Sequence, residues 1–242
     1  MIKAVLFDFD DTLVNSESAR LVALRNVALR IANMYKLNCD DVITALVKIE
    51  QDYDRRGIFD RNLWWAKAFE TLKIIPEENI INELTSIYWD VWIKNTHLYQ
   101  DTLPTISLLK SCNLKVGIIA NNDGKSGNKR RRIELSGIPS NMLDLIIVAG
   151  DDVNQIKPHP EPFIKAIDEL KIKPWEAIYV GDKPYADVPG AKEIGMFTAI
   201  VIRNNIGTYN IFNGMSYNEK PDLIIGNLMQ LPFILKCDTI QY

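Results

Sequence analysis

Three acidic residues fall within four positions directly after an apolar run near the N-terminus. The run Ala4–Phe7 leads into Asp8, Asp10 and Asp11, and Thr12 follows. Carboxylates this close repel each other, and their burial is unfavourable unless positive charge lies among them. One carboxylate can attack phosphorus, and a second can protonate a leaving oxygen and then deprotonate a water. The stretch therefore predicts a reactive site that a cation completes.

Three later apolar runs also end in polar residues. Ala120-Asn121-Asn122 closes the first run, a loop leading to Lys157 follows the second, and Gly181-Asp182 with Asp187 follows the third. Ligands of open α/β sheets bind at the carboxyl ends of the strands. Asp8, Asp10 and Asp182 could therefore gather around one cation, and Mg²⁺ fits because it needs few carboxylates. A lysine at the same edge would offset charge on a phosphoryl group.

The elements expected to position these residues alternate between strand and helix. We expect strands at Ala4–Phe7, Val116–Ala120, Leu145–Val148, Ala177–Val180, Phe197–Ile202 and Asp222–Ile225, with helices near 104–111, 130–135, 162–170 and 190–194. Short apolar runs alternating with helical patterns are typical of βαβ units. They predict an α/β protein with a doubly wound, Rossmann-like parallel sheet.

Residues 16–98 have a helical pattern that interrupts this alternation. Apolar spacing predicts a first helix ending near Tyr35, a second that Asp40 or Asp41 caps and Gly57 ends, a third around Trp64, Trp65, Phe69 and Leu72, and a fourth whose first turn is Pro76-Glu77-Glu78. We expect residues 1–15 and 99–242 to form the α/β core and residues 16–98 an inserted all-α domain. Trp64, Trp65, Trp89 and Trp92 are expected in the core of the insert or where it meets the α/β domain. The Asn- and Gly-rich stretch Asn204–Glu219 predicts a mobile surface loop.

The ordered motifs resemble those of the haloacid dehalogenase-like hydrolase superfamily. The motifs DFDDT, the asparagine step at 121, KPHP and GDKPYAD match its four motifs across the whole core, and the insert matches its helical cap domain. The chain also resembles an archaeal phosphatase subgroup, some members of which act on glyceraldehyde 3-phosphate. Three segments carry this likeness: FDFDDTLV, KPHPEPF and VGDKPYADVPGAKEIGM.

The resemblance implies a role for each matching residue. Asp8 would be the nucleophile and a metal ligand, and Asp10 the general acid and base, with its backbone carbonyl on the metal. Lys157 would bind the phosphoryl group and neutralise Asp8. Asp182 would bind Mg²⁺, and Asp187 would either be a further ligand or support the ligands from behind; a helix-capping role for Asp187 is equally open.

The sequence departs from the family pattern at the second motif. The family places Ser or Thr at the end of that strand, and this chain has Ala120. We expect Asn121, together with Asn122 and backbone N–H groups, to supply the missing donors to the phosphoryl oxygens; the alternative is a weakened site with slow turnover. Thr12 is expected to support the loop after the first strand by hydrogen bonding.

The resemblance implies a Mg²⁺-dependent phosphatase acting on a small phosphorylated metabolite through an aspartyl-phosphate. Asp10 favours phosphate esters over halogenated substrates, because dehalogenases of the superfamily lack that second aspartate. Two alternatives stay open. A phosphomutase shares the motifs, and a degenerate member that binds a phosphorylated ligand as a regulator would agree with Ala120.

The composition of the chain limits the kinds of partner and location that we expect for it. The net charge is −3, which disfavours a broad nucleic-acid surface. No stretch reaches the roughly 18 apolar residues of a membrane span, and Cys39, Cys112 and Cys237 lack the spacing of a disulfide framework or a zinc site. A cytoplasmic protein is expected, with its oligomeric state open. The basic run Lys129–Arg132 is interpreted as a solvated helix face, with a local anion site as the alternative.

Overall fold

The chain divides into two compact units. The computed structural model describes residues 1–203, 216 and 219–237. The first unit holds residues 1–15, 98–122 and 127–242, and the second holds residues 16–97 and 123–126. Most of the expected loop Asn204–Glu219 lies outside the described residues.

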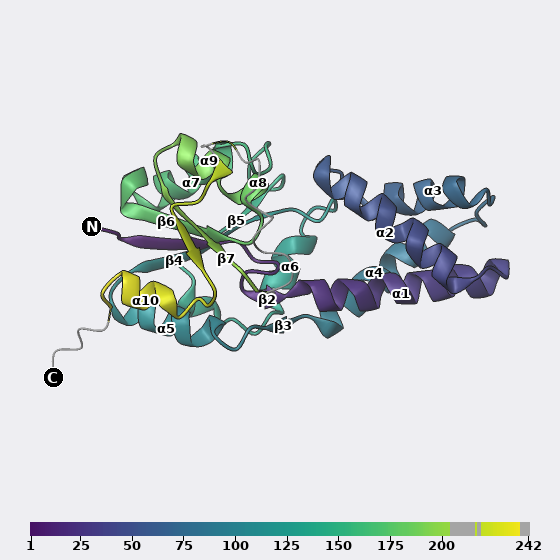
Figure 1. Ribbon diagram of the computed structural model, residues 1–242, viewed down its shortest axis with the longest axis horizontal. Coiled ribbons are helices and arrows are strands. Elements are labelled where there is room, and N and C mark those ends of the chain that lie inside the picture. Colours follow the sequence, from purple (N-terminus) through teal and green to yellow (C-terminus); the bar gives the residue numbers. More distant parts are fainter. Residues whose placement is uncertain (204–215, 217–218, 238–242) are drawn as a thin grey trace. The chain divides into compact units, whose positions relative to one another are not determined.

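The first unit is built on a six-stranded parallel sheet (Figure 1). Its strands, in spatial order, are β5 (Leu145–Ala149), β4 (Lys115–Asn121), β1 (Ala4–Phe7), β6 (Ala177–Gly181), β7 (Phe197–Val201) and β8 (Leu223–Ile225). Phe7 pairs with Ile118 of β4 and with Val180 of β6. The chain thus continues from β1 to one side and later returns to the other, which places a topological switch point at the carboxyl end of β1.

Both faces of this sheet are covered by helices, as Figure 1 shows. Val5 and Phe7 of β1 belong to one buried cluster, and Ala4 and Leu6 belong to another. A strand buried on both faces must be apolar at every position, which explains the continuous apolar run. The helices of this unit are α5 (Thr102–Ser111), α6 (Asn128–Glu134), α7 (Glu161–Leu170), α8 (Pro184–Asp187), α9 (Pro189–Glu193) and α10 (Gln230–Ile234). The expected α/β doubly wound fold is confirmed.

The second unit is helical. It contains α1 (Ser16–Tyr35), α2 (Cys39–Arg55), α3 (Arg61–Leu72) and α4 (Ile80–Asn95). The four tryptophans Trp64, Trp65, Trp89 and Trp92 are all buried in its apolar cluster, so they form its core. The short strands β2 (Val14–Asn15) and β3 (His97–Leu98) form a separate two-stranded sheet.

Two expected helix starts in this unit are wrong. Asn38, and not Asp40 or Asp41, caps α2, because its side chain accepts hydrogen bonds from the backbone N–H groups of both aspartates. Residues 76–78 precede α4, which begins at Ile80 after Asn79 in a left-handed conformation. Acidic residues ahead of a helix therefore gave the same pattern as acidic residues in its first turn.

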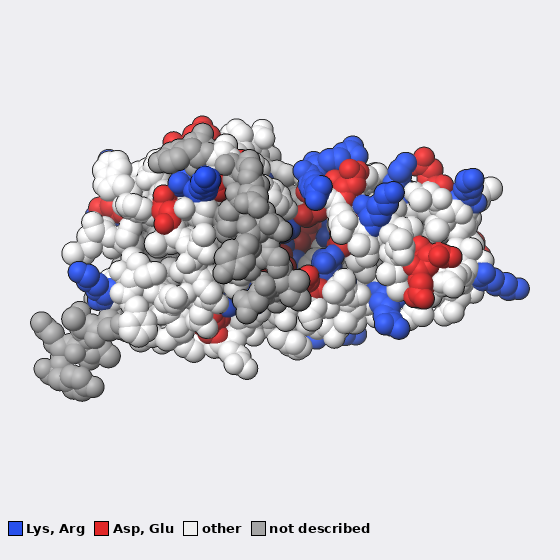
Figure 2. Space-filling view, viewed as in Figure 1, with Lys and Arg blue, Asp and Glu red and all other residues white. Residues whose placement is uncertain are grey.

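The surface shown in Figure 2 carries Lys and Arg interspersed with Asp and Glu over the helices of the second unit. Such mixing is typical of a solvated surface. Among the described residues, no helix combines the length and the apolar character that crossing a membrane requires.

Candidate active site

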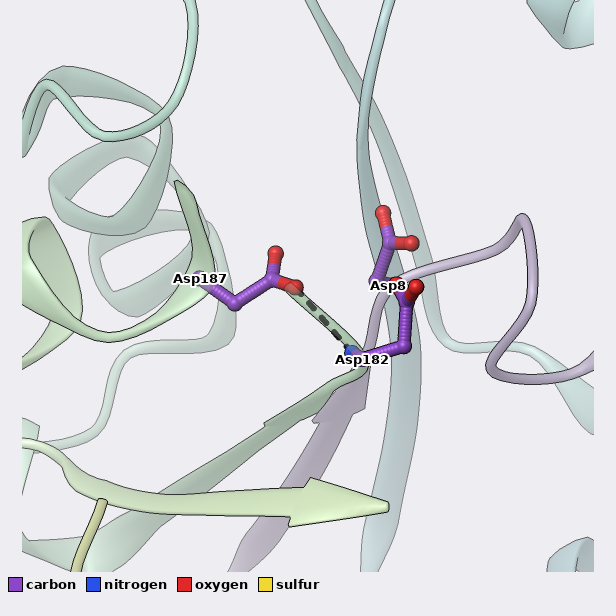
Figure 3. Close-up of side chains that lie close together, drawn as sticks. All are labelled: Asp8, Asp182 and Asp187. Atoms are coloured by element: carbon purple, nitrogen blue, oxygen red, sulfur yellow. Dashed lines mark hydrogen bonds between the residues drawn. The ribbon is translucent and has the colours of Figure 1, made fainter. Parts of the chain in front are cut away.

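Three carboxylates meet at the carboxyl ends of two neighbouring strands. Asp8 follows β1, Asp182 follows β6, and Asp187 ends the short helix α8 (Figure 3). One ligand oxygen from each lies within 4.8 Å of the others. The register of β1 and β6 brings together residues that lie far apart in the sequence.

Lys157 supplies positive charge to this group. It lies between β5 and α7, and its side chain is only 3% exposed. Its Nζ donates to Asp8 Oδ1 and to Asp187 Oδ1, each at 2.7 Å. Burial acts to lower the pKa of Lys157, but the two carboxylates raise it further than burial lowers it, so the ammonium form is favoured. The lysine therefore neutralises Asp8 directly.

Asp187 is fixed by both of its oxygens. Its Oδ1 accepts a hydrogen bond from Lys157 Nζ. Its Oδ2 accepts hydrogen bonds from the backbone N–H groups of Asp182 at 3.1 Å and Lys183 at 2.9 Å. A Cβ atom at Gly181 would lie 2.2 Å from Asp187 Oδ2, so only glycine permits this approach. The capping alternative for Asp187 is wrong, because its carboxylate turns back to the strand end and no side chain among the described residues caps α9.

The carboxylate oxygens of Asp8, Asp182 and Asp187 are a set of ligands that fits a hard divalent cation. Burial, followed by the repulsion of Asp187 and Asp8, raises the pKa of Asp182 well above its usual range. Burial also raises the pKa of Asp8, even though Lys157 opposes the effect. Asp182 Oδ1 is buried and accepts no hydrogen bond from any described residue. A buried oxygen without a donor, beside two carboxylates, is the chemistry that Mg²⁺ satisfies.

Tyr179 belongs to the site, although it lies in none of the four motifs. Its hydroxyl accepts from Lys157 Nζ at 2.6 Å and donates to the carbonyl of Ile119 on β4 at 2.8 Å. Burial and the nearby Asp187 raise the pKa of Tyr179, so the hydroxyl keeps its proton. The sequence feature that could have indicated Tyr179 is its hydroxyl group, which is the one side-chain hydroxyl in the otherwise apolar strand β6.

Asp10 lies beside two cations of α6. Lys129 and Arg132 both contact its carboxylate, one Arg132 contact being 3.1 Å from Nη1 to Oδ2. Burial acts to raise the pKa of Asp10, but Arg132 and Lys129 together hold it well below its usual range. The interpretation of Lys129–Arg132 as a solvated face is wrong for these two residues, which are 5% and 4% exposed.

The two asparagines at the carboxyl end of β4, Asn121 and Asn122, contact neighbouring loops. Asn121 Oδ1 accepts from the backbone N–H of Lys157 at 2.8 Å, and its Nδ2 donates to the Lys157 carbonyl at 3.2 Å. Asn122 Nδ2 donates to Asp151 Oδ1 at 3.2 Å. An amide nitrogen has two hydrogens, and the contact to Lys157 occupies one of those of Asn121. Ala120, at the family's Ser or Thr position, is buried in the core of the sheet.

The loop after β1 is held through its backbone. Thr12 is fully buried, yet its hydroxyl has no hydrogen-bond partner among the described residues. Its carbonyl instead accepts from the guanidinium of Arg203, which also contacts Asp101 Oδ2 at 2.7 Å. Asp11 adopts a left-handed conformation with φ of 57°, which allows the chain to turn sharply after the acidic residues.

Comparisons with known proteins find a matching family, similar sequences and a similar fold. Residues 5–201 match the family described as haloacid dehalogenase-like hydrolase. The chain is 28% identical to a glyceraldehyde 3-phosphate phosphatase of Methanopyrus kandleri over 96% of both chains. It is also 28% identical to the pyrophosphatase PpaX of Bacillus anthracis over 97% of this chain and 96% of that one. The crystal structure of a phosphatase of this family from Thermococcus onnurineus superposes with a TM-score of 0.67 at 29% identity, covering 97% of this chain and 98% of the other.

Proposed function

Because the chain belongs to the haloacid dehalogenase-like hydrolase family, we propose that it is a Mg²⁺-dependent phosphatase with Asp8 as its nucleophile. The substrate is a small phosphorylated compound. Glyceraldehyde 3-phosphate and pyrophosphate, which the names of the relatives point to, are the first two to compare.

The single observation that carries the proposal is the position of Asp8 between Lys157 and Asp182. Lys157 Nζ lies 2.7 Å from Asp8 Oδ1, and a ligand oxygen of Asp182 lies within 4.8 Å of one from Asp8. A carboxylate in this position keeps its charge balanced while it presents an oxygen to phosphorus. The same lysine can stabilise charge on the phosphoryl oxygens in the transition state.

The reaction proceeds in two displacements on phosphorus. In the first, an oxygen of Asp8 forms a bond to phosphorus as the bond to the leaving oxygen breaks, and Asp10 donates a proton where the leaving group needs one. In the second, water attacks phosphorus, the bond to Asp8 breaks, and Asp10 takes the proton of the water. Lys129 and Arg132 lower the pKa of Asp10 and so favour its ionised form, which is the form that can accept this proton.

Asp8 and Asp182 would hold Mg²⁺, with Asp187 at their side and the backbone carbonyl of Asp10 as a further ligand. Bound there, Mg²⁺ would screen the nucleophile from the charge of the substrate. Lys157 binds the phosphoryl group, with the side chains of Asn121 and Asn122 as further donors.

We propose that the helical insert, residues 16–98, acts as a cap domain that excludes water and selects the substrate. The Arg203 contact to the carbonyl of Thr12 supports the loop that carries Asp10. The cytoplasmic location expected from the sequence stays a prediction.

Phosphate release tests the proposal. The panel contains glyceraldehyde 3-phosphate, pyrophosphate and p-nitrophenyl phosphate, each with Mg²⁺ or with EDTA, for wild type, Asp8→Asn and the exposed control Asp168→Asn. We expect metal-dependent release from wild type and from the control, and none from Asp8→Asn. Release that persists in Asp8→Asn would overturn the proposal. A separate assay with a sugar 1-phosphate covers the alternatives: isomerisation without net phosphate release would indicate a phosphomutase, and Mg²⁺-dependent binding without turnover would indicate a regulator.

A further inference from the structure

We propose that Lys129 and Arg132 form an anion subsite that selects phosphoryl donors whose leaving group carries its own negative charge. The inference rests on the proposed phosphatase function and names the substrate class of that site. It assigns Lys129 and Arg132 of α6 a use beyond their contacts to Asp10.

The two cations act from one side of one helix. Lys129 and Arg132 are three residues apart on α6, so their side chains project from the same face. Lys129 Nζ contacts Asp10 Oδ2, and the guanidinium of Arg132 contacts both oxygens of Asp10. Arg132 also lies over the ring of Phe9, with Cζ 5.8 Å from the ring centroid. Both side chains are therefore buried and held in place.

Their neighbours on the same helix have other environments. Arg130 Nη2 pairs with Asp152 Oδ2 at 2.5 Å, and Arg131 is exposed. The basic run is thus divided. Two members reach the catalytic carboxylate and the other two do not, which gives the experiment a matched control in Arg131.

The position of Asp10 places these cations on the leaving-group side. A general acid and base must come within hydrogen-bond distance of the leaving oxygen. Lys129 and Arg132 contact the carboxylate that occupies this place, so an anionic group on the departing fragment comes within their reach. An aldehyde or alcohol fragment without charge offers them nothing to bind.

The chemistry of an anhydride fits this arrangement. As Asp8 bonds to one phosphorus of pyrophosphate, the P–O bond to the bridging oxygen breaks and the electron pair remains on the departing phosphate. Lys129 and Arg132 offset that charge, so no proton has to reach the bridging oxygen. Water then attacks the phosphoryl group on Asp8, that P–O bond breaks, and Asp10 accepts the proton.

The test compares substrates with charged and uncharged leaving groups. Pyrophosphate and phosphoglycolate carry a second phosphate and a carboxylate, respectively, and glyceraldehyde 3-phosphate carries neither on its leaving fragment. Steady-state kinetics are measured for wild type, Lys129→Met, Arg132→Met and Arg131→Met. We expect wild type to favour the charged class, and kcat/KM for that class to fall about 10- to 100-fold more than for glyceraldehyde 3-phosphate in the first two variants, because each removes a charge-assisted contact. Arg131→Met should keep the wild-type ratio, and a loss confined to pyrophosphate or to phosphoglycolate would identify which anion the subsite accepts.

An equal loss for every substrate would overturn the inference, because it would mean that the two cations only position Asp10. A wild type that prefers glyceraldehyde 3-phosphate would overturn it as well, while leaving the phosphatase proposal intact. If the methionine variants do not fold, Lys129→Arg and Arg132→Lys replace them, because they keep the positive charge. A second experiment needs no substitution: imidodiphosphate and methyl phosphonate compete for wild type, and their affinities are compared. Preference for methyl phosphonate there would contradict the subsite. A wild type that releases no phosphate from any substrate would instead contradict the proposed function.

Discussion

Lys157 donates a hydrogen bond to Asp8 at 2.7 Å from a position that is almost fully buried. The same ammonium group holds Asp187. One cation thus balances two carboxylates, while the pKa of Asp182, the third, stays raised although Lys183 opposes the effect, and the proposed Mg²⁺ would supply further positive charge there. This division between the lysine and a metal ion leads to the first two predictions.

Lys157→Met should destabilise the protein and abolish most of its activity. Removing one partner of a buried charge pair leaves the other uncompensated and costs about 3–5 kcal/mol. We expect a lower Tm in EDTA and a larger gain on adding Mg²⁺ than in wild type, since the cation then has more negative charge to neutralise. Lys165→Met, at a lysine of α7 whose side chain is 36% exposed, is the control. A Mg²⁺ response no larger than that of wild type would contradict this account of the charges.

Asp182→Asn should remove the response to Mg²⁺ without destabilising the metal-free protein. At about 100 times its Kd, a ligand that binds only the folded state stabilises it by about 2.7 kcal/mol. We expect that gain for wild type and a much smaller one for the variant. In EDTA the variant should melt at the same or a higher temperature, because the buried repulsion with Asp8 and Asp187 is relieved. A clearly lower Tm in EDTA would show that Asp182 has a structural partner instead.

Tyr179→Phe should weaken the hold on Lys157 with a modest loss of stability. The hydroxyl joins Lys157 to the carbonyl of Ile119, and its loss leaves that carbonyl without the donor, at a cost of about 1–3 kcal/mol. Chemical denaturation with urea measures the loss. Unchanged stability would mean that a water replaces the hydroxyl.

Asn121→Ala should lower kcat more than it raises KM. The side chain bonds both backbone groups of Lys157, so its removal lets the lysine shift relative to Asp8. Loss of about 1–3 kcal/mol of positioning corresponds to roughly a 10- to 100-fold slower reaction. Unaltered kcat and KM would remove Asn121 both as a phosphate donor and as a positioning residue.

The contacts of the Asp144 carboxylate, outside the active site, predict that the stability of the protein depends on pH. Its Oδ2 accepts from Lys110 Nζ at 2.6 Å and from the N–H of Val116 at 2.7 Å. Burial acts to raise the pKa of Asp144, but these contacts together lower it below the ordinary value of 3.8.

A carboxyl with a lowered pKa in the folded state stabilises the protein above its unfolded pKa, and the stabilisation is lost as the pH falls through the folded value. Asp144→Asn should therefore cost about 1 kcal/mol at neutral pH. Urea denaturation should show the difference from wild type shrinking below about pH 3.8. A difference that stays constant down to the acid end would contradict the assignment.

The strands of the core could be predicted because each is a short run buried on both faces. Ala4–Phe7 was expected at its observed bounds, and the ends of the later runs indicated where Asp182 and Lys157 would meet Asp8. The four-residue helix α8 was not expected, because so short an element has no apolar period to read. α10 was also not expected, and its five residues give an equally short pattern.

The roles of Lys129, Arg132 and Tyr179 could not be read from the sequence. Lys129 meets Asp10 across 119 positions, and a basic run on a helix has the same pattern whether it is solvated or buried. The partner of Tyr179 on β4 is likewise fixed by the order of the strands and not by local spacing. Tertiary contacts of this kind decide which charged residue is buried, and only the fold supplies them.

The central claim is that Asp8 carries the phosphoryl group during turnover. The Asp10→Asn variant gives the most direct test, because p-nitrophenolate leaves without a proton but the second step then lacks its base. After reaction with p-nitrophenyl phosphate and Mg²⁺ and an acid quench, peptide mass spectrometry should find one phosphoryl group on the peptide that contains Asp8. The double variant Asp8→Asn, Asp10→Asn should carry none. A phosphoryl group on another residue, or p-nitrophenolate release with no phosphorylated peptide at any time, would contradict the account.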